Sequence, residues 1–291
     1  MKAGAVLLAL GLLLGTTQAV AQQKASQLPV VSGDNLLDEA FQLLYRLRFD
    51  EARQKIAAWE VDHDGDPRGP AAEAASYLFE EFYAQGVMTS EFFTDDKKLL
   101  DGKPLVPDPQ RQINFLSAVD RAQKLANLRL QTNKSDPNAL FALAISHGML
   151  SDYDCIVVRK QLDALHNVKE AESDAVKLLA VQPDSADADV PIGIGNYIIG
   201  CLPGYKRAIV WFGGVHGDRA AGMDQLRVAA DRGHYLKPFA QLLLALAALR
   251  EKQPDLARTE LNQLTAEFPD NPLFARELAK LAPPRIASDS H

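Results

Sequence analysis

The stretch QPDLARTELNQLTAEFPDNP, residues 253–272, has the signals of one complete helix. Pro254 and Asp255 suit a first helical turn, where backbone N–H groups need no intrahelical partner and negative charge is favoured. Pro269 and Pro272 forbid continuation of the helix. Between these signals the apolar residues recur at helical spacing, namely Leu256, Leu261, Leu264 and Phe268. The stretch therefore predicts an amphipathic helix with a defined start and stop.

The distance from a small residue to a proline stop in this helix is repeated upstream. Ala257 lies 12 residues before Pro269, and Ala171 lies 12 residues before Pro183. A stop at the same place in two helices indicates a repeated unit. We also expect residues 153–180 to form one long helix before the second of these stops.

A second spacing of 12 residues links neighbouring helices at both ends of the chain. Ala245 lies 12 residues before Ala257, and Ala40 lies 12 residues before Ala52. Two antiparallel helices need small residues where their axes come closest. The spacing therefore predicts helix pairs, and it does so more strongly than either helix alone.

Composition agrees with a helical fold. The 291-residue chain is 47% hydrophobic and 24% charged, and long stretches are rich in the good helix formers Ala, Leu, Glu, Arg and Gln. Runs of alternating β-branched residues are nearly absent, which predicts an all-α protein. The formal net charge of −7 argues against a nucleic-acid partner, because such a partner requires a basic face.

The pattern of small residue, small residue and proline at successive intervals of 12 is similar to that of the tetratricopeptide repeat (TPR). In the last unit Ala245, Ala257 and Pro269 stand at the small, small and proline positions of that family. Its hydrophobic positions are also filled, by Leu244, Leu261 and Leu264. The resemblance implies an αα-hairpin repeat solenoid, here over residues 34–282.

The other units depart from the family pattern. The unit ending at Pro183 matches in its second helix only, and the first unit has Asp64 at the proline position. The signature Trp and Tyr of the first helix are missing, with Gln241 and Ala248 in their places in the last unit. The resemblance is to a divergent TPR array, similar to bacterial exported TPR proteins.

Residues 187–233 are an irregular repeat, rich in Gly, aromatic and branched residues. They resemble a segment of some divergent TPR proteins in which an apolar Gly/Tyr helix leads to a second helix of pattern GDR..G...L..AA. The residues that carry this pattern are Gly217, Asp218, Arg219, Gly222, Leu226, Ala229 and Ala230. The resemblance implies a modified repeat, in which Asp218 caps the second helix.

The N-terminal residues have the three parts of a secretory signal peptide. Lys2 precedes an uncharged apolar run at residues 3–15, and Ala19-Val20-Ala21 forms an A-x-A cleavage site. The alternative is a membrane anchor, but the run is shorter than the roughly 20 residues of a span. We expect cleavage after Ala21, a periplasmic or secreted protein, and no membrane span in the mature chain. A flexible leader at 22–33 and a disordered tail at 283–291 complete the domain organisation.

Cys155 and Cys201 both lie in the exported part, where an oxidising compartment favours a disulfide. The alternative is two buried free thiols, because cysteine packs well as a small hydrophobic residue.

No motif indicates catalysis, a cofactor or a metal. Gly193, Gly195 and Gly200 lack the strand and the spacing of a nucleotide loop, so we interpret them as close-packing positions. An acidic turn has the ligand spacing of an EF-hand, with Asp62, Asp64, Asp66 and Glu73, but Pro67 replaces the required glycine. The histidines form no paired metal motif. We therefore predict a non-enzyme.

The best functional candidates are aromatic and basic residues of the irregular repeat. They are Tyr197, Tyr205, Arg207, Trp211 and His216. Aromatic residues with Arg are favoured at recognition hot spots, and the alternative is that they plug an irregular place in the array.

Two functions remain open from the sequence. The first is an exported scaffold that binds a protein or peptide along the groove of successive first helices. The alternative is a periplasmic accessory protein that binds a small organic or lipid-like ligand in an apolar pocket around residues 191–217.

Overall fold

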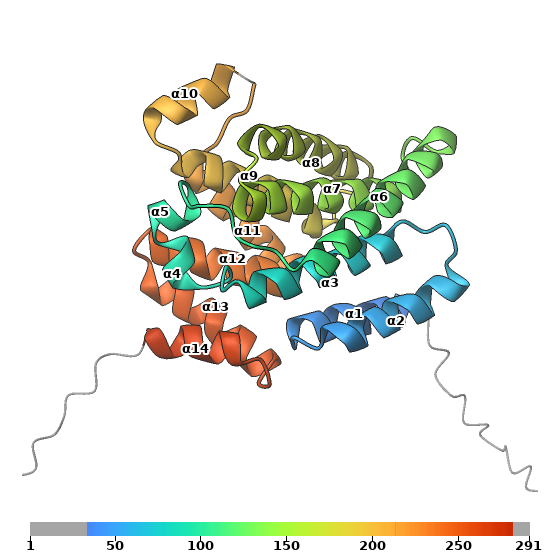
Figure 1. Ribbon diagram of the computed structural model, residues 1–291, viewed down its shortest axis with the longest axis horizontal. Coiled ribbons are helices and arrows are strands. Elements are labelled where there is room, and N and C mark those ends of the chain that lie inside the picture. Colours follow the sequence, from blue (N-terminus) through green and yellow to red (C-terminus); the bar gives the residue numbers. More distant parts are fainter. Residues whose placement is uncertain (1–33, 213, 282–291) are drawn as a thin grey trace, which may run out of the picture. The chain divides into compact units, whose positions relative to one another are not determined.

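The computed structural model describes residues 34–281 except Gly213, and every regular element in this part of the chain is a helix (Figure 1). These helices belong to one compact unit. The predicted signal peptide, leader, cleavage site and tail lie outside the described residues. The prediction of an all-α fold is confirmed.

Ten long helices pack as five consecutive pairs, and an eleventh follows them. The pairs are α1 (Asp34–Tyr45) with α2 (Phe49–Asp62), α3 (Arg68–Ala84) with α6 (Pro109–Thr132), α7 (Pro137–Asp152) with α8 (Gln161–Val181), α9 (Asp189–Cys201) with α11 (Arg219–Arg232), and α12 (Lys237–Arg250) with α13 (Pro254–Glu267). Helix α14 (Pro272–Lys280) packs against α13. The second helix of each pair also contacts the first helix of the next, which is how a TPR-like array propagates.

Short helices lie inside three of the pairs and at one junction between pairs. They are α4 (Ser90–Phe93) and α5 (Asp96–Leu99) inside the second pair, a π-helix (Tyr153–Val158) inside the third, a 3₁₀ turn (Ala186–Ala188) before α9, and α10 (Gly204–Phe212) inside the fourth. The prediction of one helix over residues 153–180 was wrong. Its first six residues form the π-helix, and Arg159 has a φ of 61°, which ends that helix before α8 begins.

Proline and acidic caps set the helix starts. Helices α6, α7, α12, α13 and α14 carry proline in the first turn, as predicted for α13. The Asp136 carboxylate accepts the backbone N–H of Ala139 at 3.0 Å. The predicted cap is confirmed, since the Asp218 carboxylate accepts the N–H of Ala220 at 2.8 Å.

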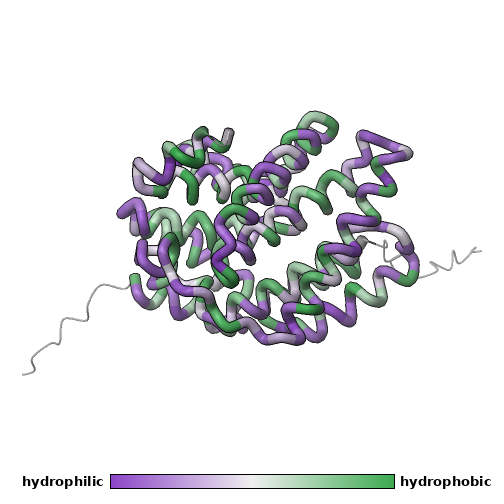
Figure 2. Tube along the Cα trace, turned by 45° about the horizontal axis from the view of Figure 1, so that its top comes forward, coloured by the Kyte–Doolittle hydropathy of each residue, from purple (hydrophilic) through white to green (hydrophobic). Residues whose placement is uncertain are grey.

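Small residues lie where the paired helices meet. Ala40, Ala52, Ala245 and Ala257 are all fully buried, as their spacing predicts. Figure 2 shows hydrophobic residues interspersed with hydrophilic ones along the helices, the pattern of amphipathic helices that bury one face.

Two glycines bring α9 and α11 unusually close. A Cβ atom at Gly222 would lie 2.6 Å from the Gly193 carbonyl oxygen and 2.6 Å from the Tyr197 backbone nitrogen. Only residues without a side chain permit this contact. Gly193, Gly195 and Gly200 all lie inside α9, which agrees with close packing and not with a nucleotide loop.

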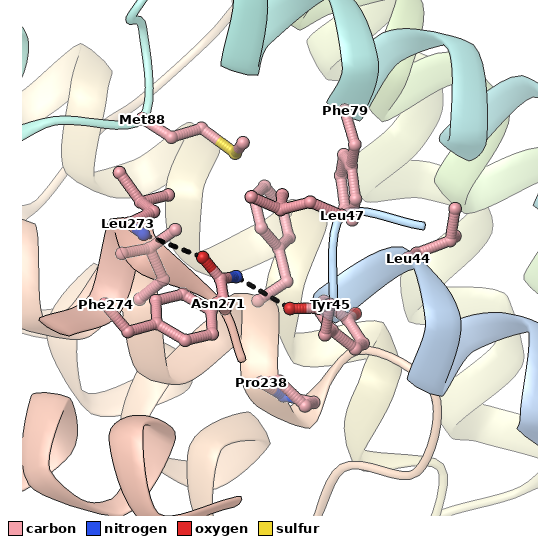
Figure 3. A pocket seen from close by; sticks show the side chains of 11 residues that line it. Leu44, Tyr45, Leu47, Phe79, Met88, Pro238, Asn271, Leu273 and Phe274 are labelled. Carbon is pink, nitrogen blue, oxygen red and sulfur yellow. Dashed lines mark hydrogen bonds between the residues drawn. The ribbon is translucent and has the colours of Figure 1, made fainter. Parts of the chain in front are cut away.

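The last helices contact the first one. The Asn271 side-chain amide donates to the Tyr45 carbonyl oxygen at 2.7 Å (Figure 3). The Tyr45 hydroxyl donates to the Tyr235 carbonyl oxygen at 2.8 Å. Arg46 and Asp270 form an ion pair at 2.6 Å beside them. A cavity of about 20 Å³ remains among these side chains, enough for about one water molecule. The array is therefore joined to itself in this unit, a contact that an open solenoid does not make.

One described segment, residues 137–158, is long and apolar enough to cross a membrane by length and composition. Within its most apolar window, 61% is buried inside the structure, and a core helix passes the same test. The absence of a membrane span in the mature chain stays a prediction.

Candidate binding site

A cavity of about 560 Å³ lies along the first helices of four successive pairs. Helices α3, α7, α9 and α12 form its inner wall, and α4, α5, α8 and α10 complete it. Most of its surface is aliphatic, including Leu99, Ile156, Leu162, Leu165, Val168, Ile194, Ile198, Ile209, Val210, Leu242, Leu243 and Leu246. This volume lies within the roughly 300–1,000 Å³ of small-molecule sites.

Helix α9 divides its side chains between the core and this cavity. Ile194 and Ile198 line the cavity and are half-buried. Gly193 and Tyr197 lie on the side that meets α11. The apolar composition of α9 therefore serves two surfaces, one packed closely against α11 and one that contacts α7 and α8 and lines the cavity.

One polar group that lines the cavity is the half-buried carboxyl of Asp152 at the end of α7. Burial raises its pKa to about 7. No hydrogen bond or ion pair is found for this carboxyl among the described residues, so a charged form there is uncompensated. The π-helix that follows turns the chain here, so residues on both sides of the turn contribute to the cavity.

Two neighbours of the π-helix add further polar atoms. Cys155 Sγ lies 3.7 Å from the Gln161 side-chain oxygen, and burial raises the pKa of its thiol to about 11. The Arg159 guanidinium donates to the carbonyl oxygens of Leu99, at 2.9 Å, and Lys98, at 2.6 Å. Arg159 thus ties α5 to the start of α8.

Helix α10 stands at the mouth of the cavity. Ile209 lines the cavity and is 68% exposed to solvent at the same time. Lys206 forms an ion pair with Asp101, which lies just after α5 on the other side of the cavity. No residue of α10 is buried.

The structure separates the five predicted surface residues. Tyr205, Arg207, Trp211 and His216 are exposed on α10 and the loop after it, and the Trp211 and His216 rings lie 6.1 Å apart, edge to face. Tyr197 was wrongly placed in this surface, because it is fully buried. Its hydroxyl donates to the Glu251 carboxylate at 3.1 Å and lies 3.3 Å from the Ala247 carbonyl oxygen.

The candidate disulfide is not formed. Cys155 and Cys201 are both free thiols, the first half-buried in the π-helix and the second buried at the end of α9. Burial raises the pKa of both thiols.

The acidic turn uses its carboxylates for protein contacts. Asp66 accepts the Arg68 backbone N–H at 3.0 Å and pairs with the Arg68 guanidinium at 3.0 Å. Glu73 pairs with Arg121. Within the described residues, no group of three or more His, Cys, Asp or Glu side chains is placed to hold a metal ion.

Sequence reasoning missed the groups that distinguish the cavity, above all Asp152, Leu162 and Arg159. The only local signal was the pair of carboxylates, Asp152 and Asp154, in the mostly apolar run of residues 148–158. The lining comes from elements that are far apart in the sequence, so periodicity within one helix does not reveal it.

The last helices of the chain match a known family. Residues 238–281, which hold α12, α13 and α14, match the family model of the tetratricopeptide repeat. The match includes Ala245, Ala257 and Pro269, the residues that have the spacing of 12. The five helix pairs of the described residues have the helical-hairpin arrangement that this repeat also has.

A thermophilic TPR protein of Thermus thermophilus is similar over 86% of this chain and 98% of its own, with a TM-score of 0.45 and 14% sequence identity. That likeness is too distant to transfer any property. No curated protein matches the sequence.

Proposed function

We propose that this protein is an exported, non-catalytic scaffold that binds an apolar segment of a protein or peptide partner where α10 borders the cavity. The observation that carries the proposal is the exposure of α10, where Tyr205 is 68% exposed, Trp211 56% and Phe212 83%. A surface helix normally buries one apolar face, and α10 buries no residue. An exposed apolar face of this kind marks an interaction site.

The residue types on α10 favour a protein partner. Trp, Tyr and Arg dominate interface hot spots, and Trp211, Tyr205 and Arg207 occur within seven residues of one another. The Trp211 and Phe212 rings lie 5.2 Å apart in an edge-to-face arrangement, which limits their freedom before binding. The adjacent cavity offers space for apolar side chains that reach past Ile209.

The position of the cavity supports binding along the groove of first helices. Helices α3, α7, α9 and α12 are the first helices of their pairs, and all of them line it. Helix α10 borders this groove, as does the insert that contains α4 and α5. We expect a partner that enters the groove to contact the exposed helix α10 first.

We propose a non-catalytic protein because the residues that line the cavity offer little catalytic chemistry. Within the described residues no histidine lines it, and its one thiol, Cys155, has a pKa raised to about 11 by burial. A thiol with that pKa is protonated at neutral pH and is a poor nucleophile.

Export is proposed from the signal-peptide pattern of Lys2, residues 3–15 and Ala19-Val20-Ala21. We expect the protein from a producing bacterial cell to be periplasmic or secreted and to begin at Gln22. Intact mass measurement of the fractionated protein tests this. A protein that retains Met1 and stays with the cytoplasm would contradict it.

Site-specific photocrosslinking tests the partner surface. A photoreactive residue is placed at Phe212 and, as a matched control, at Leu128, which is 58% exposed on α6. We expect a recurrent crosslink to one other protein from position 212 and none from position 128. Equal labelling at both positions, or none, would contradict the partner surface. A crosslink only to a second copy of the chain would replace the partner with self-association.

A second candidate function is the binding of a small apolar ligand. It is favoured by the cavity itself, whose volume and aliphatic lining are those of a ligand site.

A further inference from the structure

The carboxyl of Asp152 is the one acidic group in the cavity that has no hydrogen-bond or ion-pair partner among the described residues, and the Nε of Arg159 is a second polar atom there without one. It closes α7 and faces a lining that is mostly aliphatic. Moving a carboxylate from water into such surroundings is costly unless it is paired or hydrogen-bonded. The protein keeps this group in place and supplies nothing to satisfy it, which is expected where a ligand completes the site.

The other charged groups of the cavity are at least partly satisfied. The two terminal nitrogens of Arg159 donate to the carbonyl oxygens of Leu99 and Lys98, while its Nε has no partner, and Lys206 is paired with Asp101. Neither cation forms an ion pair with Asp152. The remaining titratable neighbour is the Cys155 thiol, which burial keeps protonated and neutral.

We propose that the cavity binds an apolar molecule that carries a single protonated amine, with the ammonium group donating to the Asp152 carboxylate and the apolar body lying against α8, α9 and α12. This inference rests on the second candidate function, ligand binding. A cation of the ligand neutralises the half-buried carboxylate, and charge-assisted hydrogen bonds of this kind are the strong ones. The aliphatic lining supplies affinity through the area it removes from water.

An anionic amphiphile, such as a fatty acid, fits these charges less well. Its carboxylate would have to compete with Asp101 for Lys206, or accept from the single free Nε–H of Arg159, whose two terminal nitrogens already donate to carbonyl oxygens. It would also leave Asp152 without a counterion. A neutral alcohol would fill the cavity but gain only an ordinary hydrogen bond.

Acid should weaken binding of the amine. Burial raises the pKa of Asp152 to about 7, and only the ionised carboxylate pairs with an ammonium group. The affinity should therefore fall about tenfold for each pH unit below 7 and level off above it. Lys206 and Arg159 keep their charges over this range, and the Cys155 thiol stays neutral.

The test uses three probes with the same tail, decylamine, decanol and decanoate, with calorimetry of the mature protein at pH 8. We expect decylamine to bind most tightly. Asp152→Asn should weaken decylamine binding about 10- to 100-fold, the usual range for a charge-assisted hydrogen bond, and leave decanol within about twofold. Asp163→Asn is the matched control, because this residue is exposed on α8 and does not line the cavity.

Ile198→Trp places bulk inside the cavity and should reduce binding of all three probes, with circular dichroism to verify the fold. Equal affinity for amine and alcohol, tighter binding of decanoate, or an unchanged Asp152→Asn variant would overturn the amine inference while ligand binding stands. No binding of any decyl compound would overturn ligand binding itself. The partner surface on α10 would be unaffected by either result, because the Phe212 crosslink tests it separately.

Discussion

The Asn271 side chain joins the last repeat to the first helix through the Tyr45 carbonyl oxygen, which accepts its amide N–H at 2.7 Å. The same side chain caps α14, because its oxygen accepts the Leu273 N–H at 2.8 Å (Figure 3). Asn271 is buried, so water does not replace either of its hydrogen bonds when the side chain is removed.

Asn271→Ala should lower the free energy of unfolding by about 2 kcal/mol, since it removes a helix cap and leaves a buried carbonyl oxygen without a donor. Urea titration measures the change. Asn262→Ala is the control, because Asn262 is exposed on α13 and its replacement should stay within about 0.5 kcal/mol. Equal effects of the two substitutions would show that the contact with Tyr45 does not stabilise the fold.

Replacement by alanine should change the stability of the protein in opposite directions at two helical glycines. Gly222→Ala should destabilise by about 2 kcal/mol, because its Cβ would lie 2.6 Å from the backbone of α9. At Gly148 a Cβ would meet only the Pro191 Cβ at an ordinary 3.6 Å, so alanine should gain up to about 1 kcal/mol from helix propensity. Thermal and urea unfolding compare them, and a gain at Gly222 would rule out the close crossing.

Asp187 holds the start of α12. Its carboxylate accepts three backbone N–H groups, from His234 at 2.8 Å, Tyr235 at 2.9 Å and Leu236 at 3.1 Å. Asp187→Ala should cost about 3 kcal/mol or more, because buried donors lose a charged acceptor. Asp184→Ala, at an exposed position nearby, should cost little. Urea unfolding measures both changes. A small loss of unfolding free energy at both positions would show that Asp187 does not hold the start of α12.

The stability of the protein should depend on pH through Asp152. Burial raises its pKa in the folded state from 3.8 to about 7, so between these values the native state binds more protons than the unfolded state. Stability from this group is therefore full below pH 4 and is lost as pH rises toward 7, at about 1.4 kcal/mol for each unit. Asp152→Asn should gain stability relative to the natural protein between pH 5 and pH 8. If the difference in unfolding free energy between the variant and the natural protein is the same at pH 5 and at pH 8, the carboxyl is not desolvated.

Helix α10 should be the least protected of the helices around the cavity. It buries no residue, whereas most of α9 is buried, so its backbone hydrogen bonds open without loss of core packing. Hydrogen exchange followed by mass spectrometry should show faster exchange in peptides from residues 204–212 than in those from 189–201. Equal protection would mean that α10 is held by more than its ion pair with Asp101.

Local sequence signals were enough for the helix pairs. Prolines and acidic caps act within one helical turn, and small residues at a spacing of 12, such as Ala245 and Ala257, report where two neighbouring helices touch. Both effects involve residues close in the chain. The TPR in the last unit and the all-α fold could therefore be predicted, as could the packing role of the glycines in α9.

Only the tertiary structure decided the site. Tyr197 and Trp211 belong to the same aromatic segment, yet one is buried against α12 and the other is exposed on α10. The cavity gathers Asp152, Leu162 and Ile209 from three helices, and the contact of Asn271 with Tyr45 spans 226 residues. Such relationships depend on how whole helices are placed against each other. Each helix alone carries no record of that placement, because its own periodicity specifies which face is apolar and not what that face will meet.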